Sequence, residues 1–309
     1  MGHTNYRVSG HESFACRYAW LPKVAYHLNR DGGLLGDESR AMVELGVGKN
    51  MVRSIRFWAQ SSEIAVADGR NGRLALTSFG KALLGERGMD PYLEDIRTLW
   101  LIHWKLATSK DGPLLAWDYL INNWHEPEIT PTTVIAVLKK ETTKQGDNLS
   151  VSTITQHFDT FLHTYVPTRS RKGEILEDNL DCPLVELEFI VQRGESKFVG
   201  LKGRRESIYA FNRERKPEIS SELFVYSLDS YWNSRHAQEE TLSLREVAHG
   251  HGSPGQIFKL PEDDVRARLE ELNRDVSSPF SYAESVNLQQ VQRKKSSPEV
   301  DLLKRIFRS

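Results

Sequence analysis

LGVGKNMVRSIRFWAQ, at residues 45–60, contains a tight Gly-Val-Gly turn that leads directly into a helical pattern. Working outward to residues 37–85, the pattern gives a helix before this turn and two short strands, expected at 64–67 and 74–77, after the second helix. Helix, turn, helix and hairpin in this order are typical of a winged helix-turn-helix, a fold that usually binds DNA.

The second helix of this segment has two chemically different faces. At about 3.6 residues per turn, Met51, Ile55 and Trp58 fall on an apolar side with Ala59, while cations and an amide fall on the other. Such polar groups suit phosphates and the edges of bases. The expected DNA-binding residues are Lys49, Asn50, Arg53, Arg56 and Gln60, with Arg70 and Arg73 at the hairpin tip. The alternative is a winged helix that contacts only proteins.

Composition limits what can surround this module. The chain has 309 residues, enough for roughly two or three domains, and its 39% hydrophobic and 27% charged content is ordinary for a soluble protein. Because the net charge is only -1, a nucleic-acid surface has to be a local patch. Two cysteines are too few for a disulfide framework or a zinc site. The sequence shows neither a membrane-spanning run nor a signal peptide, so we expect a cytoplasmic protein.

The overall pattern predicts an α+β fold that is mainly helical. A first domain, 1–168, would hold the winged helix-turn-helix and a helical middle, and a smaller mixed α/β domain, 169–309, would serve dimerisation or partner contact. The basic C-terminal end is interpreted as a solvated tail, with non-specific phosphate contact as the second interpretation. Further helices are expected at 21–29, 78–84, 90–107, 130–144, 150–165, 220–232 and 261–273, and further strands at 184–191 and 197–201.

The sequence offers two weak catalytic constellations. Walker, Rossmann, CxxC and HExxH motifs are all missing. The first constellation is His11-Glu12 with Arg17, Trp20 and Lys23, which could orient a phosphodiester, bind a metal or deprotonate a water. The same residues could form a polar staple that ties the N-terminal arm to the core, and spacing alone favours the staple.

The second constellation is acidic. Asp181, followed by Glu195-Ser196-Lys197, imitates the D…(D/E)xK arrangement of magnesium nucleases. Gly194 favours a surface turn at Glu195 instead. Asp90, a third candidate metal ligand, is also explained as the N-cap of a helix.

Several motifs resemble one known family. They are Ser9-Gly10-His11-Glu12-Ser13-Phe14, Arg17-Tyr18-Ala19-Trp20-Leu21-Pro22-Lys23, residues 45–52 and Ser253-Pro254-Gly255. With them the chain resembles, over about residues 6–290, the bacterial domain-of-unknown-function family numbered four thousand and seven, found in operons for DNA phosphorothioation and phage defence. The resemblance implies a DNA-nicking subunit that acts with a cysteine desulfurase, an ATPase and a sulfur-activating enzyme. It also adds weight to His11 and Glu12, since their motif helps to identify the family.

The resulting hypothesis is a nicking endonuclease that binds double-stranded DNA and uses magnesium or manganese. Its candidate catalytic residues are His11, Glu12, Arg17 and Lys23, and its candidate metal ligands are Glu12, Asp90, Asp181 and Glu195. The competing hypotheses are a non-catalytic recognition or regulatory subunit and a pure protein scaffold. A homodimer would suit a protein that reads duplex DNA.

Overall fold

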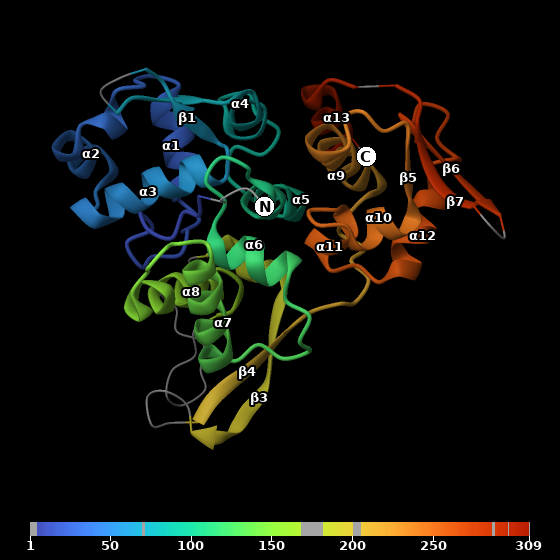
Figure 1. The fold of residues 1–309 in the computed structure, drawn as a ribbon. Coiled ribbons are helices and arrows are strands. Elements are labelled where there is room, and N and C mark those ends of the chain that lie inside the picture. The colour runs from blue at the N-terminus through green and yellow to red at the C-terminus, as the bar shows by residue number, and fades with distance from the viewer. Residues whose placement is uncertain are drawn as a thin grey trace. The chain divides into compact units, whose positions relative to one another are not determined.

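The computed structural model describes residues 5–69, 72–167, 182–199, 205–285, 288–295 and 297–308, without the side chains of 197–199. The chain is a mixed α+β protein that is mainly helical (Figure 1). It forms two compact units, Met1–Asn212 and Arg213–Ser309. Each unit is described by itself.

The first unit opens with the elements that the sequence predicts around residues 45–60. They are α1 (Trp20–Leu28), η1 (Leu34–Gly36), α2 (Glu38–Leu45), α3 (Lys49–Ser61), β1 (Ala65–Ala67), β2 (Leu74–Leu76) and α4 (Ser78–Leu84). The Asp37 side chain caps α2 by accepting from the amide of Arg40, and Gly46 ends it in the left-handed conformation at φ 66°. β1 and β2 are antiparallel, with Val66 opposite Ala75. Helix, turn, helix and hairpin therefore follow in the expected order.

A helical middle completes the core of the first unit. It consists of α5 (Ile96–Thr108), α6 (Leu115–Asn122), α7 (Pro131–Lys144) and α8 (Val151–Tyr165). α7 and α8 begin where Thr130-Pro131 and Ser150 predict. α5 begins at Ile96 and not at Asp90, because the helix is capped by Asp95, whose carboxylate accepts from the amide of Arg97. α6 is absent from the sequence prediction, and its N-cap Leu114 has no side-chain acceptor to mark it.

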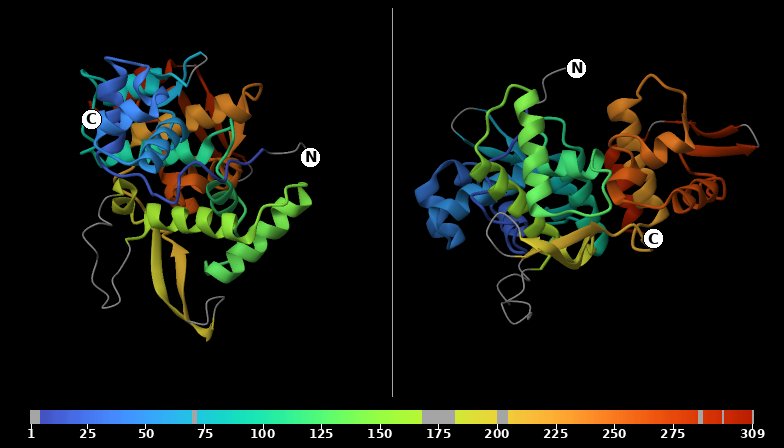
Figure 2. Two further views of the ribbon diagram at one scale, coloured as in Figure 1. Left: turned by 90° about the vertical axis from the view of Figure 1, so that its left-hand side faces the viewer. Right: turned by 60° about the horizontal axis from the view of Figure 1, so that its bottom comes forward.

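The strand predicted at 184–191 is wrong over 184–187, whereas 197–199 of the strand predicted at 197–201 do lie in a strand and 200–201 lie outside the described residues. Residues Pro183–Leu187 form the 3-10 helix η3, and the strands are β3 (Ile190–Val199) and β4 (Arg205–Phe211), paired antiparallel. This hairpin projects from the helical part of its unit (Figures 1 and 2). Its base is anchored there, because the Phe189 ring lies 4.4 Å from that of His103 and Ile129 bridges to Tyr209. The first compact unit thus extends to Asn212, and residue 168, where the sequence predicts a domain boundary, lies outside the described residues.

The second unit packs helices against a small antiparallel sheet with strand order β5-β7-β6. Its elements are α9 (Ser221–Arg235), β5 (Thr241–Ser243), α10 (Leu244–His249), α11 (Pro254–Phe258), α12 (Glu262–Glu271), β6 (Phe280–Ser285), β7 (Leu288–Arg293) and α13 (Glu299–Ile306). Leu302, Leu303 and Ile306 of α13 are buried. The prediction of a solvated tail is therefore wrong, since a basic segment also carries an apolar stripe that packs on α9.

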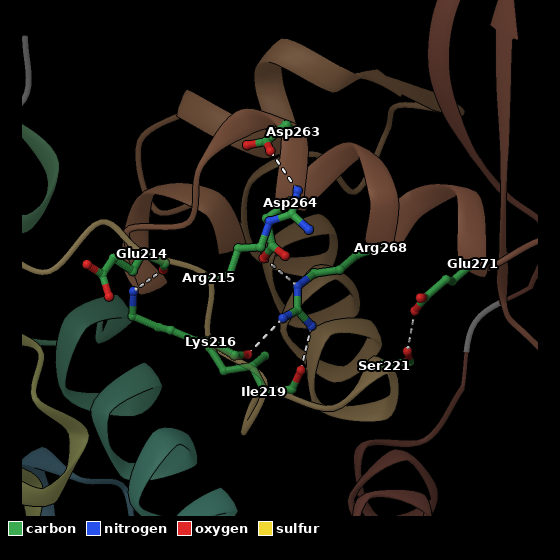
Figure 3. A network of polar contacts seen from close by, with 9 residues as sticks. All are labelled: Glu214, Arg215, Lys216, Ile219, Ser221, Asp263, Asp264, Arg268 and Glu271. Atoms are coloured by element: carbon green, nitrogen blue, oxygen red, sulfur yellow. Dashed lines mark hydrogen bonds and ion pairs between the residues drawn. The ribbon is translucent and has the colours of Figure 1, made fainter.

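A polar network fixes the entry to α9 (Figure 3). Arg268 of α12 donates to the Asp264 carboxylate at 2.8 Å and to the carbonyl oxygen of Lys216 at 2.8 Å. Around it, Arg215 pairs with Asp263 at 2.7 Å and Ser221 donates to Glu271 at 3.0 Å. The segment before α9 is thereby joined to α12 by both side-chain and main-chain contacts.

Candidate nucleic-acid interface

The outer face of α3 carries exposed cations. Val52, Ile55 and Trp58 are buried on the opposite face, while Met51, expected among them, is only half-buried. The side chains of Lys49 and Arg53 are 55% and 45% exposed. Asn50 is exposed and Gln60 half-buried. The predicted division of this helix into an apolar and a polar face is thus present.

Both exposed cations pair with one carboxylate on α2. Glu38 lies 3.2 Å from the Nζ of Lys49 and 2.7 Å from the Nε of Arg53. Hydrogen bonds from Arg53 and Lys49 lower the pKa of Glu38, and the bond to Glu38 raises the pKa of Arg53. Because these pairs are exposed to water, they are screened, and a phosphate can compete with Glu38 for both cations.

Arg56 has a different position from the one expected. It is half-buried, and its Nη1 donates to the carbonyl oxygen of Leu35 at 3.0 Å and to that of Gly72. Arg56 therefore joins η1 to the β1–β2 hairpin. Arg73 is exposed near Asp31, whose pKa its charge helps to lower after the contacts from Gly33 and Arg40. Arg70 lies outside the described residues.

The N-terminal arm lies along α3. The guanidinium of Arg7 stands 4.3 Å from the centre of the Phe57 ring, and the Arg7 amide donates to the carbonyl oxygen of Pro113 at 2.9 Å. Burial lowers the pKa of Arg7, and the positive charge of Arg56 lowers it further. Further along, the Trp58 indole donates to the carbonyl oxygen of Phe14 at 2.9 Å. The arm is thus held against the C-terminal half of α3.

His11 is a buried staple between this arm and the helical middle. It is 3% exposed, and its Nε2 lies 3.2 Å from the Nδ1 of His157. The amide of Ala116 donates to the Nε2 of His157 at 3.1 Å, so a neutral His157 carries its proton on Nδ1, facing His11. Burial lowers the pKa of His157 to about 3 and also lowers that of His11. Both rings are therefore neutral near pH 7.

The loop next to His11 has an unusual backbone. Gly10, Glu12 and Ser13 have φ values of 103°, 49° and 64°. For the two residues with a Cβ, this left-handed conformation costs on the order of 1 kcal/mol each and needs support from the surrounding structure. Glu12 is half-buried, and its charge contributes to the raised pKa of Arg53 after that of Glu38. Glu12 therefore lies within electrostatic range of Arg53.

A family model described as "Protein of unknown function (DUF4007)" matches residues 8–307. The chain belongs to this DUF4007 family. Two solved structures have the same fold. "Magnesium ion-bound SspB crystal structure" has a TM-score of 0.80 and 26% identity, over 96% of this chain and 85% of that one. "SspB crystal structure" has a TM-score of 0.79 and 24% identity, over 98% and 88%, and shows the fold alone. No curated protein matches.

The remaining residues of the first constellation lie in α1 or just before it. They are Arg17, Trp20 and Lys23. The Arg17 guanidinium lies 5.7 Å from the centre of the Trp20 ring, and Trp20 is buried. The Nζ of Lys23 lies 3.5 Å from the carbonyl oxygen of Leu45 at the end of α2.

Within the described ranges, none of the helices combines the length and the apolar character that a membrane span requires.

The described candidate metal ligands, Glu12, Asp90 and Glu195, do not belong to a cluster of metal-ligating side chains. Among the described side chains, no group of three or more His, Cys, Asp or Glu residues is placed to hold a metal ion. Asp90 accepts from the amides of Glu94 at 2.9 Å and Asp95 at 3.1 Å, so both of its oxygens serve a turn. Glu195 lies within β3 opposite Ser207, and not on a turn. Asp181 and the side chain of Lys197 lie outside the described part of the chain.

Two residues that contact the candidate site residues, Glu38 and His157, were not predicted from the sequence. Glu38 has a local signal, because an acid at the first position of α2 is common at a helix N-terminus, but nothing in that position reveals a contact across the turn. His157 has no local signal, since it lies 146 positions after His11 in the sequence. Both contacts are tertiary.

Proposed function

We propose that the protein binds double-stranded DNA through α3 and the β1–β2 hairpin, and nicks one strand within a DNA phosphorothioation system. Membership of the DUF4007 family and the shared fold with SspB support a place in such a system. The proposed partners are a cysteine desulfurase, an ATPase and a sulfur-activating enzyme. A homodimer on duplex DNA is part of the same proposal.

The cationic face of α3 is the observation that carries the DNA-binding step. Lys49 is the first residue of α3 and Arg53 stands one turn later, at the end of the helix that a helix-turn-helix protein directs at base edges. Arg56 fixes the hairpin beside this helix through the carbonyl oxygen of Gly72. The helix α3 and the β1–β2 hairpin, the two DNA-contacting parts of a winged helix-turn-helix, would then contact the duplex together.

Glu12 is the candidate for the nicking step. Its charge acts on Arg53, so a phosphate bound at Arg53 would lie close to the strained loop that carries Glu12. A carboxylate in that position can orient a water toward a phosphodiester. The magnesium in a relative's structure suggests a divalent cation, but the described carboxylates do not assemble a site for one, so no step here is assigned to a metal.

Conversion of supercoiled plasmid to open circles tests the nicking step. The purified protein is incubated with magnesium or manganese, with a chelator in parallel. Glu12→Gln should remove nicking while duplex binding is retained. Glu188→Gln is the matched control, because Glu188 is exposed and also has a left-handed backbone at φ 46°. Equal loss in both variants would reject a specific role for Glu12.

A binding titration against salt tests the α3 interface. Arg53→Glu should weaken duplex binding and flatten the dependence of log K on log salt by about one unit, because one phosphate contact is lost. An unchanged slope would reject α3 as the recognition helix. Tight binding without nicking under any metal would favour the second candidate, a non-catalytic recognition subunit that positions partner enzymes.

A further inference from the structure

A groove of about 720 Å³ lies beside α1, at the end of α4 and the turn that follows it, within the first unit. Its lining includes Tyr18, Tyr26 and Tyr92 together with Lys23 and Arg30. We propose that this groove binds single-stranded nucleic acid, with bases stacked on Tyr26 and Tyr92 and phosphates at Lys23 and Arg30. The inference rests on the proposed function in one respect, since a nicked duplex exposes the end of a single strand.

One face of α1 alternates cation and aromatic ring. Lys23, Tyr26 and Arg30 are spaced three and four residues apart, so their side chains share a face of the helix and its end. Tyr26 is 53% exposed, so much of its side chain is open to a ligand. The Arg30 guanidinium lies 3.7 Å from the centre of the Tyr26 ring and pairs with Glu86 at 3.0 Å. The ring is therefore already oriented by its neighbour.

A rigid turn keeps the side chain of Tyr92 exposed to solvent. Asp90 is buried and binds two amides of this turn, and Leu93 is 1% exposed with a φ of 58°. Between these two anchors Tyr92 is 73% exposed. An exposed ring on a fixed turn loses little conformational freedom when a base stacks on it. By holding this turn, the buried carboxylate of Asp90 fixes the position of Tyr92.

The charges of the groove favour a polyanion as its occupant. The lining carries two cations, Lys23 and Arg30, against one carboxylate, Glu86, which Arg30 already pairs. Aromatic faces combined with cations are the usual surface for single strands, because every base can stack and every nucleotide carries a phosphate. A proline-rich peptide also prefers aromatic grooves but has no need of the cations. It is therefore an alternative outcome of the test.

Fluorescence anisotropy with a labelled oligothymidine about ten nucleotides long tests the proposal on the full chain. Tyr26→Ala and Tyr92→Ala should each raise its Kd by about 5- to 150-fold, the loss expected for one stacked base. Tyr26→Phe and Tyr92→Phe should bind as the wild type does, because they keep the aromatic face. Unchanged oligonucleotide affinity in both alanine variants would overturn the proposal, as would a groove that binds a proline-rich peptide and not the oligonucleotide.

Arg53→Glu separates this inference from the proposed function. It should weaken duplex binding and leave oligothymidine binding unchanged, whereas Tyr92→Ala should do the reverse. If the protein never nicks plasmid but its oligothymidine binding depends on Tyr26 and Tyr92, the groove stands without the nickase. If nicking occurs and both alanine variants bind the oligonucleotide normally, the nickase stands without the groove.

Discussion

His11 and His157 form a buried pair of neighbouring rings, and both rings are neutral near pH 7. Their nitrogens are 3.2 Å apart and both side chains are buried, so a proton added to either ring would place a charge in an apolar core. The physical role of His11 in this structure is to attach the strained loop to α8. A catalytic role for Glu12, next to it, would depend on that attachment.

Acid should destabilise the protein through this pair. The pKa of His157 falls from 6.5 to about 3 on folding, so below pH 6.5 the unfolded chain binds a proton that the folded chain does not. Stability attributable to His157 is therefore complete above pH 6.5 and is lost as the pH falls toward 3, by about 1 kcal/mol per pH unit. Urea unfolding between pH 7 and 5 should show a shallower pH dependence in His157→Gln. His163→Gln, at an exposed position of α8, should keep the wild-type dependence, and identical pH profiles for all three proteins would contradict this assignment.

Gly10 is a second residue on which the loop depends. At φ 103° a side chain is strained, and a Cβ would also come within 3.0 Å of the Cδ2 atom of Phe57. Gly10→Ala should lower the free energy of unfolding by about 1 to 2 kcal/mol. Gly146→Ala is the control, since Gly146 has a φ of 91° and nothing lies within 4 Å of its added Cβ. If both variants lose the same stability in urea, the contact with Phe57 has no energetic effect.

Side-chain caps helped to place some helices from the sequence, and two helices without a cap were not predicted. Ser150 and Thr77 accept amide hydrogen bonds at the starts of α8 and α4, and both helices have the predicted bounds to within a residue. α6 and α13 lack such a cap and were missed. β4 was also not predicted, although it forms a hairpin with the preceding strand β3, because strand formation depends on side-chain packing against the partner strand, which local composition does not reveal.

The candidate site was predictable only where it lies on one element. The cationic stripe of α3 follows from helical periodicity, and two of its members, Lys49 and Arg53, are exposed as expected. Arg56 belongs to the same stripe but lies against η1 and the hairpin, which the periodicity of one helix cannot show. The approach of Glu12 to Arg53 depends on how the arm packs, and spacing carries no information about that.

The turn between α4 and α5 provides a test that separates a structural carboxylate from a metal ligand. Asp90→Ala should lower the free energy of unfolding by about 1 to 2 kcal/mol, because the amides of Glu94 and Asp95 lose their acceptor. It should also weaken oligothymidine binding through Tyr92. Asp111→Ala, at an exposed position, should change neither. Unchanged stability together with loss of magnesium-dependent nicking would instead make Asp90 a metal ligand.

At the scale of the whole molecule, the charge distribution limits how the proposed DNA binding can arise. The net charge of -1 gives no general attraction for a polyanion, so binding at α3 has to come from a few cations close together. The C-terminal end is also basic, but Arg305 donates to the carbonyl oxygen of Ser277 and α13 packs on α9. Cations near the C-terminus therefore belong to a folded unit with its own core.

Charge reversals at two places distinguish a local patch from a general field. Lys294→Glu with Lys295→Glu changes the net charge from -1 to -5 at two exposed residues of the second unit, while Arg53→Glu changes it only to -3. If the α3 patch binds DNA, Arg53→Glu should weaken duplex binding and also reduce the slope of log K against log salt by about one unit. The double reversal at Lys294 and Lys295 should leave that slope unchanged. Titrations of one duplex at several salt concentrations measure both effects. A larger loss in the double variant would mean that the total charge, or the basic C-terminal end, governs binding, and the patch on α3 would lose its assigned role.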